Sequence, residues 1–212
     1  MAKPALHRLT RSPSHYRPRQ PAGFRGAVAL GGIALVLGVV RLASGAEPDP
    51  VCSLQTRHFR LDIAADATSL HAIDRQTGKD YLATGPRAPF ASVHKAGRQY
   101  PASAVQFSSG RLTVSFGESG IRALLQVVAR EDYLVVEVVG VEGHGVEQLV
   151  FVDVPLALRG DPREPLAAAA LALNLKTNVS ELPRMGGRLR AACYPRFGMV
   201  GAQVAIVACP QA

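Results

Sequence analysis

The sequence predicts an all-β fold, an antiparallel β-sandwich that follows an N-terminal signal or anchor helix. From about residue 57 onward, apolar and polar residues alternate with a period of two, which is typical of strands. Turn signals separate these segments at short spacing, which favours antiparallel strands over a strand–helix–strand fold. The 166 residues after the N-terminal segment are enough for one hydrophobic core.

Residues 1–46 have the three parts of a secretory signal. They contain seven basic side chains and no acidic one, an apolar run over 27–40, and small residues that end at Ala46. The run is short for a bilayer span, which takes about 20 apolar residues. We expect a signal peptide cleaved after Ala46 or, because Arg41 follows the apolar run, an uncleaved membrane anchor. In either case we expect the folded part to be periplasmic or secreted, with membrane contact only through this segment.

Basic residues concentrate in the N-terminal segment and not in the folded part. After residue 46, 17 lysines and arginines face 16 aspartates and glutamates. Nucleic-acid binding needs a clustered basic surface, so we expect no nucleic-acid partner.

Residues 47–56 are expected to be a linker, and 57–212 the sandwich domain. Within the domain, 58–64 alternates as a strand, and 69–85 is typical of two strands around a turn at Thr77-Gly78. A Ser-Ser-Gly turn ending at Gly110 separates the next two alternating segments.

The middle of the domain is apolar on both strand faces. Segments 121–130 and 133–141, joined at Glu131-Asp132, and segment 148–158 show this pattern. We expect the central strands to be covered on both sides, by a second sheet and by a further partner. For 164–175 the alanine run favours a helix by local propensity while "LALNLKTNV" fits a strand, so both remain open. The last strand is expected near 202–209.

No sequence motif for catalysis or cofactor binding occurs: the chain has no G-x-S-x-G, phosphate loop, dinucleotide fingerprint or H-E-x-x-H. The four histidines after residue 46 are scattered, so we expect no metal site and no cofactor; they are His58, His71, His94 and His144.

Glycoside hydrolysis needs two carboxylates across a sugar, and four carboxylates of the domain lie in strands or turns. Glu137 and Asp153 lie in apolar strands, and we expect pairing with arginine in preference to a catalytic pair. Asp74 and Asp80 flank a turn, where aspartate accepts backbone hydrogen bonds. We therefore assign no catalytic residue.

The segment "YPRFG" supplies candidate ligand contacts in Tyr194, Arg196 and Phe197. Its aromatic rings and guanidinium are suited to stacking on a sugar or pairing with a carboxylate. The alternative is a loop packed in a domain interface. The chain has no tryptophan, so tyrosines would have to provide the aromatic platform of a sugar site.

Three cysteines follow residue 46: Cys52, Cys193 and Cys209. A Cys193–Cys209 disulfide is one option outside the cytoplasm. A hairpin turning near Met199 would place Cys209 too far along the ladder, so we favour three free, mostly buried thiols.

The segment "FRLDIAADATSLHAIDRQTGKDYL" resembles the first hairpin of galactose-mutarotase-like β-sandwich domains. Such domains precede the catalytic (β/α)8 barrel in many bacterial glycoside hydrolases, and the resemblance extends over about residues 55–210. The matching residues are Leu70, Ile73, Asp74, Thr77, Gly78, Lys79 and Leu82. In these hydrolases the catalytic carboxylates lie in the barrel, which this sequence lacks.

The resemblance implies a non-catalytic β-sandwich domain of an exported carbohydrate-active protein, as an N-terminal portion or truncated product. Its expected partner is a catalytic barrel domain or partner chain packed on the sheet. The alternative is a stand-alone extracytoplasmic module that binds carbohydrate or another protein. A small independent enzyme is a third reading.

Overall fold

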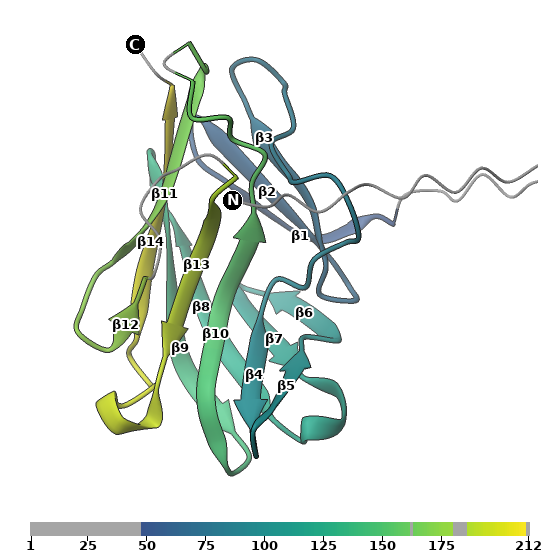
Figure 1. Ribbon diagram of the computed structural model, residues 1–212, viewed down its shortest axis with the longest axis vertical. Helices are drawn as coiled ribbons and strands as arrows, with labels where there is room; N and C mark the ends of the chain where they lie inside the picture. The colour runs from purple at the N-terminus through teal and green to yellow at the C-terminus, as the bar shows by residue number, and fades with distance from the viewer. Residues whose placement is uncertain (1–47, 162, 180–185, 211–212) are drawn as a thin grey trace, which may run out of the picture. The chain divides into compact units, whose positions relative to one another are not determined.

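The computed structural model describes residues 48–161, 163–179 and 186–210, which form an all-β structure of antiparallel sheets (Figure 1). The expected signal or anchor segment and its cleavage position at Ala46 lie outside the described residues. In the described ranges, the helices are single 3₁₀ turns, η1 (Gly117–Ser119) and η2 (Pro195–Phe197). None of the helices found there has the length and hydropathy to cross a bilayer.

The strands pair in three sheets. One sheet has the order β1 (Pro50–Gln55), β2 (Phe59–Ala64) and β3 (Ser69–Asp74). The second has the order β12 (Thr177–Asn178), β13 (Arg188–Cys193), β10 (Val146–Pro155), β4 (Ser92–Lys95) and β5 (Arg98–Pro101). The third has the order β11 (Leu166–Ala172), β14 (Gln203–Pro210), β9 (Tyr133–Glu142), β8 (Arg122–Ala129), β7 (Arg111–Ser115) and β6 (Ala104–Ser108). Strand β1 lies within the segment that was expected to be a linker.

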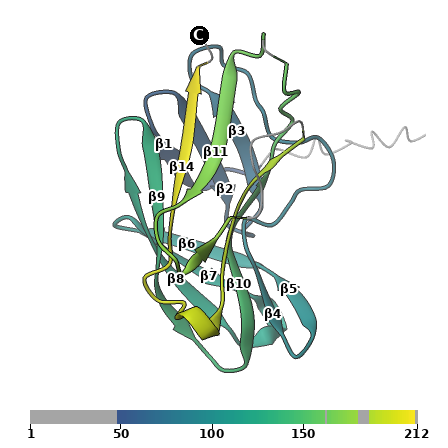
Figure 2. The ribbon, with the colours of Figure 1, turned by 60° about the vertical axis from the view of Figure 1, so that its left-hand side comes forward.

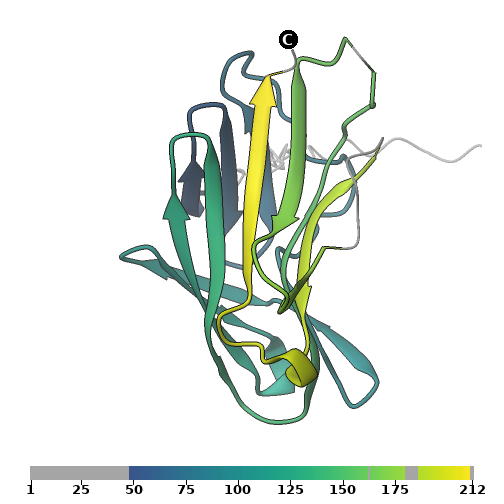
Figure 3. The same ribbon diagram turned by 90° about the vertical axis from the view of Figure 1, so that its left-hand side faces the viewer.

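Side chains from all three sheets meet in one core, as in a β-sandwich. Figure 3 shows strands of the six-stranded sheet in front and the dark-blue strands β1–β3 behind their upper parts. In β9 the inward residues are Leu134, Val136 and Val138, which alternate as the period of two predicts. The fully buried aromatic side chains of this core are Phe59, Tyr81, Phe90, Phe116 and Phe151.

Short turns connect several strand pairs where the sequence signals them. Between β6 and β7, Ser109 and Gly110 have φ of 49° and 76°, the positive values that a tight two-residue hairpin requires. The β8–β9 turn lies at Glu131-Asp132, and the β9–β10 turn at 143–145. The predicted hairpins at Ser109-Gly110 and Glu131-Asp132 are confirmed, whereas the turn at 143–145 joins strands of two different sheets.

The segment left open between helix and strand forms β11. It pairs antiparallel with β14 along its whole length, and Leu166, Ala168 and Ala170 face the core. Tertiary pairing therefore overrides the helix propensity of alanine. Figure 2 shows β11 and β14 side by side.

The stretch 69–85 has one regular strand, β3, and a second arm that pairs only through isolated bridges. Asp74 is buried and accepts hydrogen bonds from Gln76 N (2.9 Å) and Thr77 Oγ1 (2.5 Å). The aspartate therefore fixes the turn, as the sequence predicts.

Asp80 fixes the second arm of the same stretch. Its carboxylate accepts hydrogen bonds from the amides of Ala72 and Leu82, both at 2.9 Å, and lies 2.7 Å from Nδ1 of His71. Burial disfavours the ionised form, but these hydrogen bonds outweigh it and lower the pKa of Asp80. The ionised carboxylate is thus part of the folded structure.

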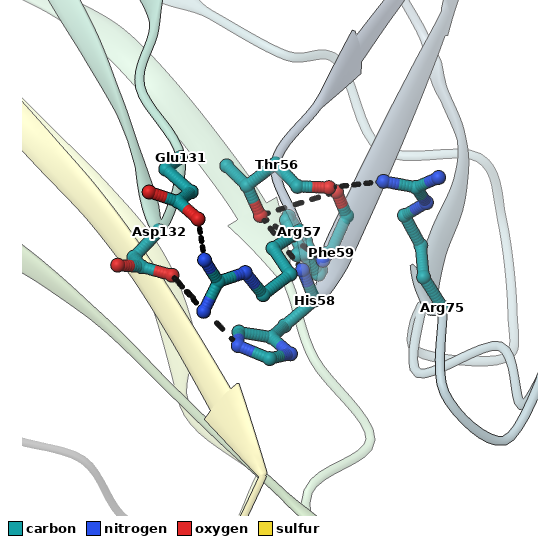
Figure 4. A network of polar contacts seen from close by, with 7 residues as sticks. All are labelled: Thr56, Arg57, His58, Phe59, Arg75, Glu131 and Asp132. Carbon is teal, nitrogen blue, oxygen red and sulfur yellow. Dashed lines mark hydrogen bonds and ion pairs between the residues drawn. The ribbon is translucent and has the colours of Figure 1, made fainter.

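The β1–β2 turn is built around Thr56 (Figure 4). Its hydroxyl accepts hydrogen bonds from the backbone N–H groups of His58 (3.3 Å) and Phe59 (3.1 Å), and Arg75 donates to its carbonyl. The turn is thereby tied to the connection that follows β3.

The strands that the sequence predicts to be apolar on both faces differ in how fully they are buried. In β10, Leu149, Val150, Phe151 and Val152 are all buried, so this strand is covered on both sides as expected. In β8 and β9 the outward apolar side chains are only half-buried. The outer face of the six-stranded sheet therefore keeps partly accessible apolar surface.

The turn between β9 and β10 supplies a stability prediction. Gly143 has φ of +100°, and a Cβ there would lie 2.6 Å from Cδ1 of Ile121 and 2.8 Å from the carbonyl oxygen of Gly120. Gly97 also has positive φ (+69°) but no atom within 4 Å. We expect Gly143→Ala to lower the free energy of unfolding by about 2 kcal/mol more than Gly97→Ala, because only the first adds a clash. Urea unfolding followed by circular dichroism measures both, and equal losses would contradict the packing at Gly143.

Candidate functional site

The candidate ligand contacts Tyr194, Arg196 and Phe197 lie on and beside the η2 turn between β13 and β14. Tyr194 is extended at the N-cap, Pro195 begins the helix, and the amide of Phe197 bonds to the Tyr194 carbonyl at 3.1 Å. Gly198, with φ of +79°, ends the turn. Proline at the start and glycine at the end are the local signals for such a short helical turn.

A pocket of about 330 Å³ opens beside this turn. One wall is formed by Tyr194 and Phe197, and the other by the β11–β12 connection. The residues that line it are Ala172, Leu175, Lys176, Thr177, Asn178, Val179, Tyr194 and Phe197. Ligand pockets have volumes of roughly 300 to 1,000 Å³, so this one is at the small end of that range.

The two walls are bonded to each other. Lys176 Nζ donates to the Val200 carbonyl at 2.7 Å, and Asn174 Nδ2 donates to the Gly201 carbonyl at 2.7 Å. Asn174 also caps its own turn by accepting from the amide of Lys176 at 3.1 Å. These bonds set the separation between the β11–β12 connection and the η2 loop.

The aromatic side chains of the pocket contact two polar residues outside its lining, Gln148 and Arg196. Gln148 of β10 donates to the Tyr194 hydroxyl at 2.7 Å. The guanidinium of Arg196 lies 4.6 Å from the ring centroid of Phe197 and 5.7 Å from that of Tyr194. Phe197 is about half exposed, at 52%. The arrangement presents an aromatic surface with a cation beside it.

A second pocket, of about 270 Å³, lies at the start of β8. Arg122 and Glu142 line it and pair with each other at 3.2 Å. No aromatic side chain is among its lining residues. It therefore offers less to a ligand than the pocket beside η2.

The two strand carboxylates do not face each other. Asp153 of β10 pairs with Nε of Arg188 at 2.7 Å, as predicted. Glu137 of β9 lies between the core residues Val136 and Val138 and so points to the outer face of another sheet. The structure therefore does not join them in a glycosidase-type pair.

The histidines lie apart from one another on separate elements. His71 is nearest to an acidic group, with Nδ1 2.7 Å from Oδ2 of Asp80, whereas Nε2 of His58 lies 3.8 Å from Oδ1 of Asp132. Arg57 binds the same turn through Glu131 and Asp132, so these contacts join the β1–β2 turn to the β8–β9 turn (Figure 4). In the described part of the chain, no group of three or more histidine, cysteine, aspartate or glutamate side chains could hold a metal ion.

All three cysteines are free thiols. Cys193 lies in β13 of the five-stranded sheet and Cys209 in β14 of the six-stranded sheet. The predicted hairpin between these strands is wrong, because the η2 loop crosses from one sheet to the other. Cys193 pairs with Leu149 and Thr177, and Cys209 with Ala167.

Sequence reasoning found the η2 wall of the pocket but missed the opposite wall. Lys176 and Val179 are distant from "YPRFG" in the sequence, and no local pattern joins the two segments. The turn residues "NLKTN" indicate a loop, but they do not indicate that this loop lies beside the η2 turn. No protein-family model matches the chain, and no curated protein matches it.

The cysteines supply a second prediction. Burial raises the pKa of Cys193 to about 12; burial and the negative charge of Asp62 raise that of Cys52 to about 12. Both thiols stay protonated between pH 7 and 9, and protonated thiols react slowly. We expect only the exposed Cys209 to react rapidly with a disulfide reagent over this pH range.

Unfolding in urea should release the other two thiols, and Cys209→Ser should remove the rapid phase. Three rapid thiols in the native protein would contradict the burial of Cys52 and Cys193.

Proposed function

We propose that this chain is a non-catalytic β-sandwich domain of an exported carbohydrate-active protein, and that it binds a glycan in the pocket beside η2. The observation that carries the proposal is the aromatic wall formed by Tyr194 and Phe197, with Arg196 beside it. The sequence resemblance to mutarotase-like sandwich domains of glycoside hydrolases supports the same class of protein.

The pocket has the chemistry that a sugar ring requires. One face of a pyranose carries C–H groups, which pack on an aromatic ring, while its edge carries hydroxyls that need donors and acceptors. The Phe197 ring is half exposed and accessible for such stacking. Lys176, Thr177 and Asn178 line the opposite wall and offer polar groups. A largely preformed concave site with a few polar groups is typical of small-ligand binding.

The binding prediction uses calorimetric titration of the full chain against a panel of oligosaccharides. For those that bind, we expect Phe197→Ala to weaken binding about tenfold, which corresponds to ~1.4 kcal/mol, because the stacking surface is lost. Phe107→Ala is the matched control: Phe107 is an exposed aromatic on β6, at the opposite edge of the six-stranded sheet from β11. A panel without saturable binding, or equal effects of the two substitutions, would refute the proposal.

A second candidate function is packing against a catalytic barrel or partner chain, and the outer face of the six-stranded sheet favours it. Strand register places Leu171, Ala205, Val135 and Val128 in one row across β11, β14, β9 and β8. Ala169, Val207 and Tyr133 form the adjacent row. Leu171 is 52% exposed and Tyr133 is 39% exposed. An apolar strip of this kind is typical of surfaces that bind another protein.

If this strip binds a partner, the unpartnered chain should associate with itself through it. We expect Leu171→Lys to reduce the average mass in light scattering at high protein concentration. Gln106→Lys, on the exposed part of β6, should leave the mass unchanged. Equal masses for the parent chain and both variants would argue against the packing role.

A further inference from the structure

We propose that the ligand of the pocket beside η2 is an acidic glycan, and that Arg196 and Lys176 bind the carboxylate of a uronic-acid residue. This inference rests on the proposed glycan-binding function and specifies its ligand class. It comes from the cations around the pocket and from the geometry that holds them.

The described segments that form the pocket carry cations and no carboxylate. Residues 165–179 and 186–210 contain Lys176, Arg188, Arg190 and Arg196 and no aspartate or glutamate. Arg188 is paired with Asp153. Across the described residues, neither Lys176 nor Arg196 forms an ion pair with a carboxylate. Two cations beside one pocket, neither paired with a carboxylate of the described residues, favour an anionic ligand.

Contacts with aromatic rings position the Arg196 side chain and leave its N–H donors available for a ligand. Its guanidinium packs on the rings of Phe197 and Tyr194, and the described structure shows no hydrogen bond from it. A stacked guanidinium keeps its N–H groups directed outward in the plane of the fork. That planar fork matches the two oxygens of a carboxylate. The stacking thus orients the guanidinium for bidentate binding at the rim of the pocket.

Lys176 supplies the second positive charge from the opposite wall. One of its three N–H bonds is used on the Val200 carbonyl, and two are left for a ligand. The same bond packs the amine against the loop: a Cβ added at Gly201 would lie 3.3 Å from Nζ. The hydrogen bond to Val200 therefore holds the ammonium group at one position beside the pocket.

A hexuronic acid can make two contacts in this arrangement: its ring stacks on Phe197, and its carboxylate pairs with Arg196. A sugar ring stacked on Phe197 lies next to Arg196, since the guanidinium is 4.6 Å from the same ring centroid. The carboxylate on C5 of a hexuronic acid projects from the edge of the ring, where the guanidinium can reach it. A neutral hexose would make the stacking contact but would offer neither cation an anionic partner.

The test compares an oligomer of hexuronic acid with the methyl-esterified oligomer of the same length, in calorimetric titrations of the full chain. We expect the acidic oligomer to bind about tenfold more tightly, because charge-assisted hydrogen bonds add to stacking. Arg196→Gln should reduce affinity for the acidic oligomer by about five- to tenfold and leave affinity for the ester unchanged. Lys176→Met removes a charge and also the bond to the Val200 carbonyl, so it should reduce affinity for both oligomers, and more for the acidic one. Added salt should weaken the binding of the acidic oligomer and leave the binding of the ester unchanged.

Arg98→Gln is the matched control. Arg98 is also an exposed arginine stacked on an aromatic ring, 5.2 Å from the centroid of Tyr100, but it lies on β5. The basic N-terminal segment attracts any polyanion, and this attraction is the same in all the variants. If Arg98→Gln weakens binding as much as Arg196→Gln, the attraction is nonspecific and the inference is wrong.

The outcomes separate this inference from the proposed function. Equal, saturable binding of the acidic and esterified oligomers, lost in Phe197→Ala, would keep glycan binding and overturn the preference for a carboxylate. Binding of neither, together with a blank panel of neutral sugars, would overturn both. Preference for the acidic oligomer that depends on Arg196 and Lys176 supports both.

Discussion

The shared hydrophobic core between the sheets is the constraint on which the rest of the structure depends. Each sheet is amphipathic and must bury its apolar face against another layer. The three-stranded sheet is too small to do so alone, and it contributes Phe59, Leu61 and Ile63 to the common core. Because Phe59 lies directly after the β1–β2 turn, the bonds around Thr56 also fix how this sheet enters the core.

Loops that follow core strands take their positions from this packing. Tyr81 and Phe90 are fully buried, so the long connection between β3 and β4 is anchored at two points. Lys79 lies 4.1 Å from the Tyr81 ring centroid and 3.8 Å from Oε1 of Glu164, which joins the loop before β11 to the same region. Glu164 in turn accepts hydrogen bonds from the amides of Arg159 and Gly160. Polar contacts at the core margin thus determine where β11 begins.

Sequence patterns predict strands well here and strand neighbours poorly. Alternation identifies β2 and β7 because alternate apolar side chains of each strand are buried in the core. It leaves β11 ambiguous, since an alanine-rich segment has weak side-chain preferences and its state is decided by pairing with β14. It also suggests a β13–β14 hairpin where the chain crosses between sheets. In the same way, the local grouping in "YPRFG" identifies Tyr194 and Phe197 as candidates but not Lys176, whose position depends on a contact between distant segments.

The bonds from Lys176 and Asn174 to the η2 loop have a thermodynamic consequence. They are made within the folded chain, between the β11–β12 connection and the η2 loop. The entropy of ordering the loop is therefore lost before any ligand arrives, which favours tight binding by a rigid occupant. By linkage, an occupant that binds only the folded form raises the melting temperature of the whole domain.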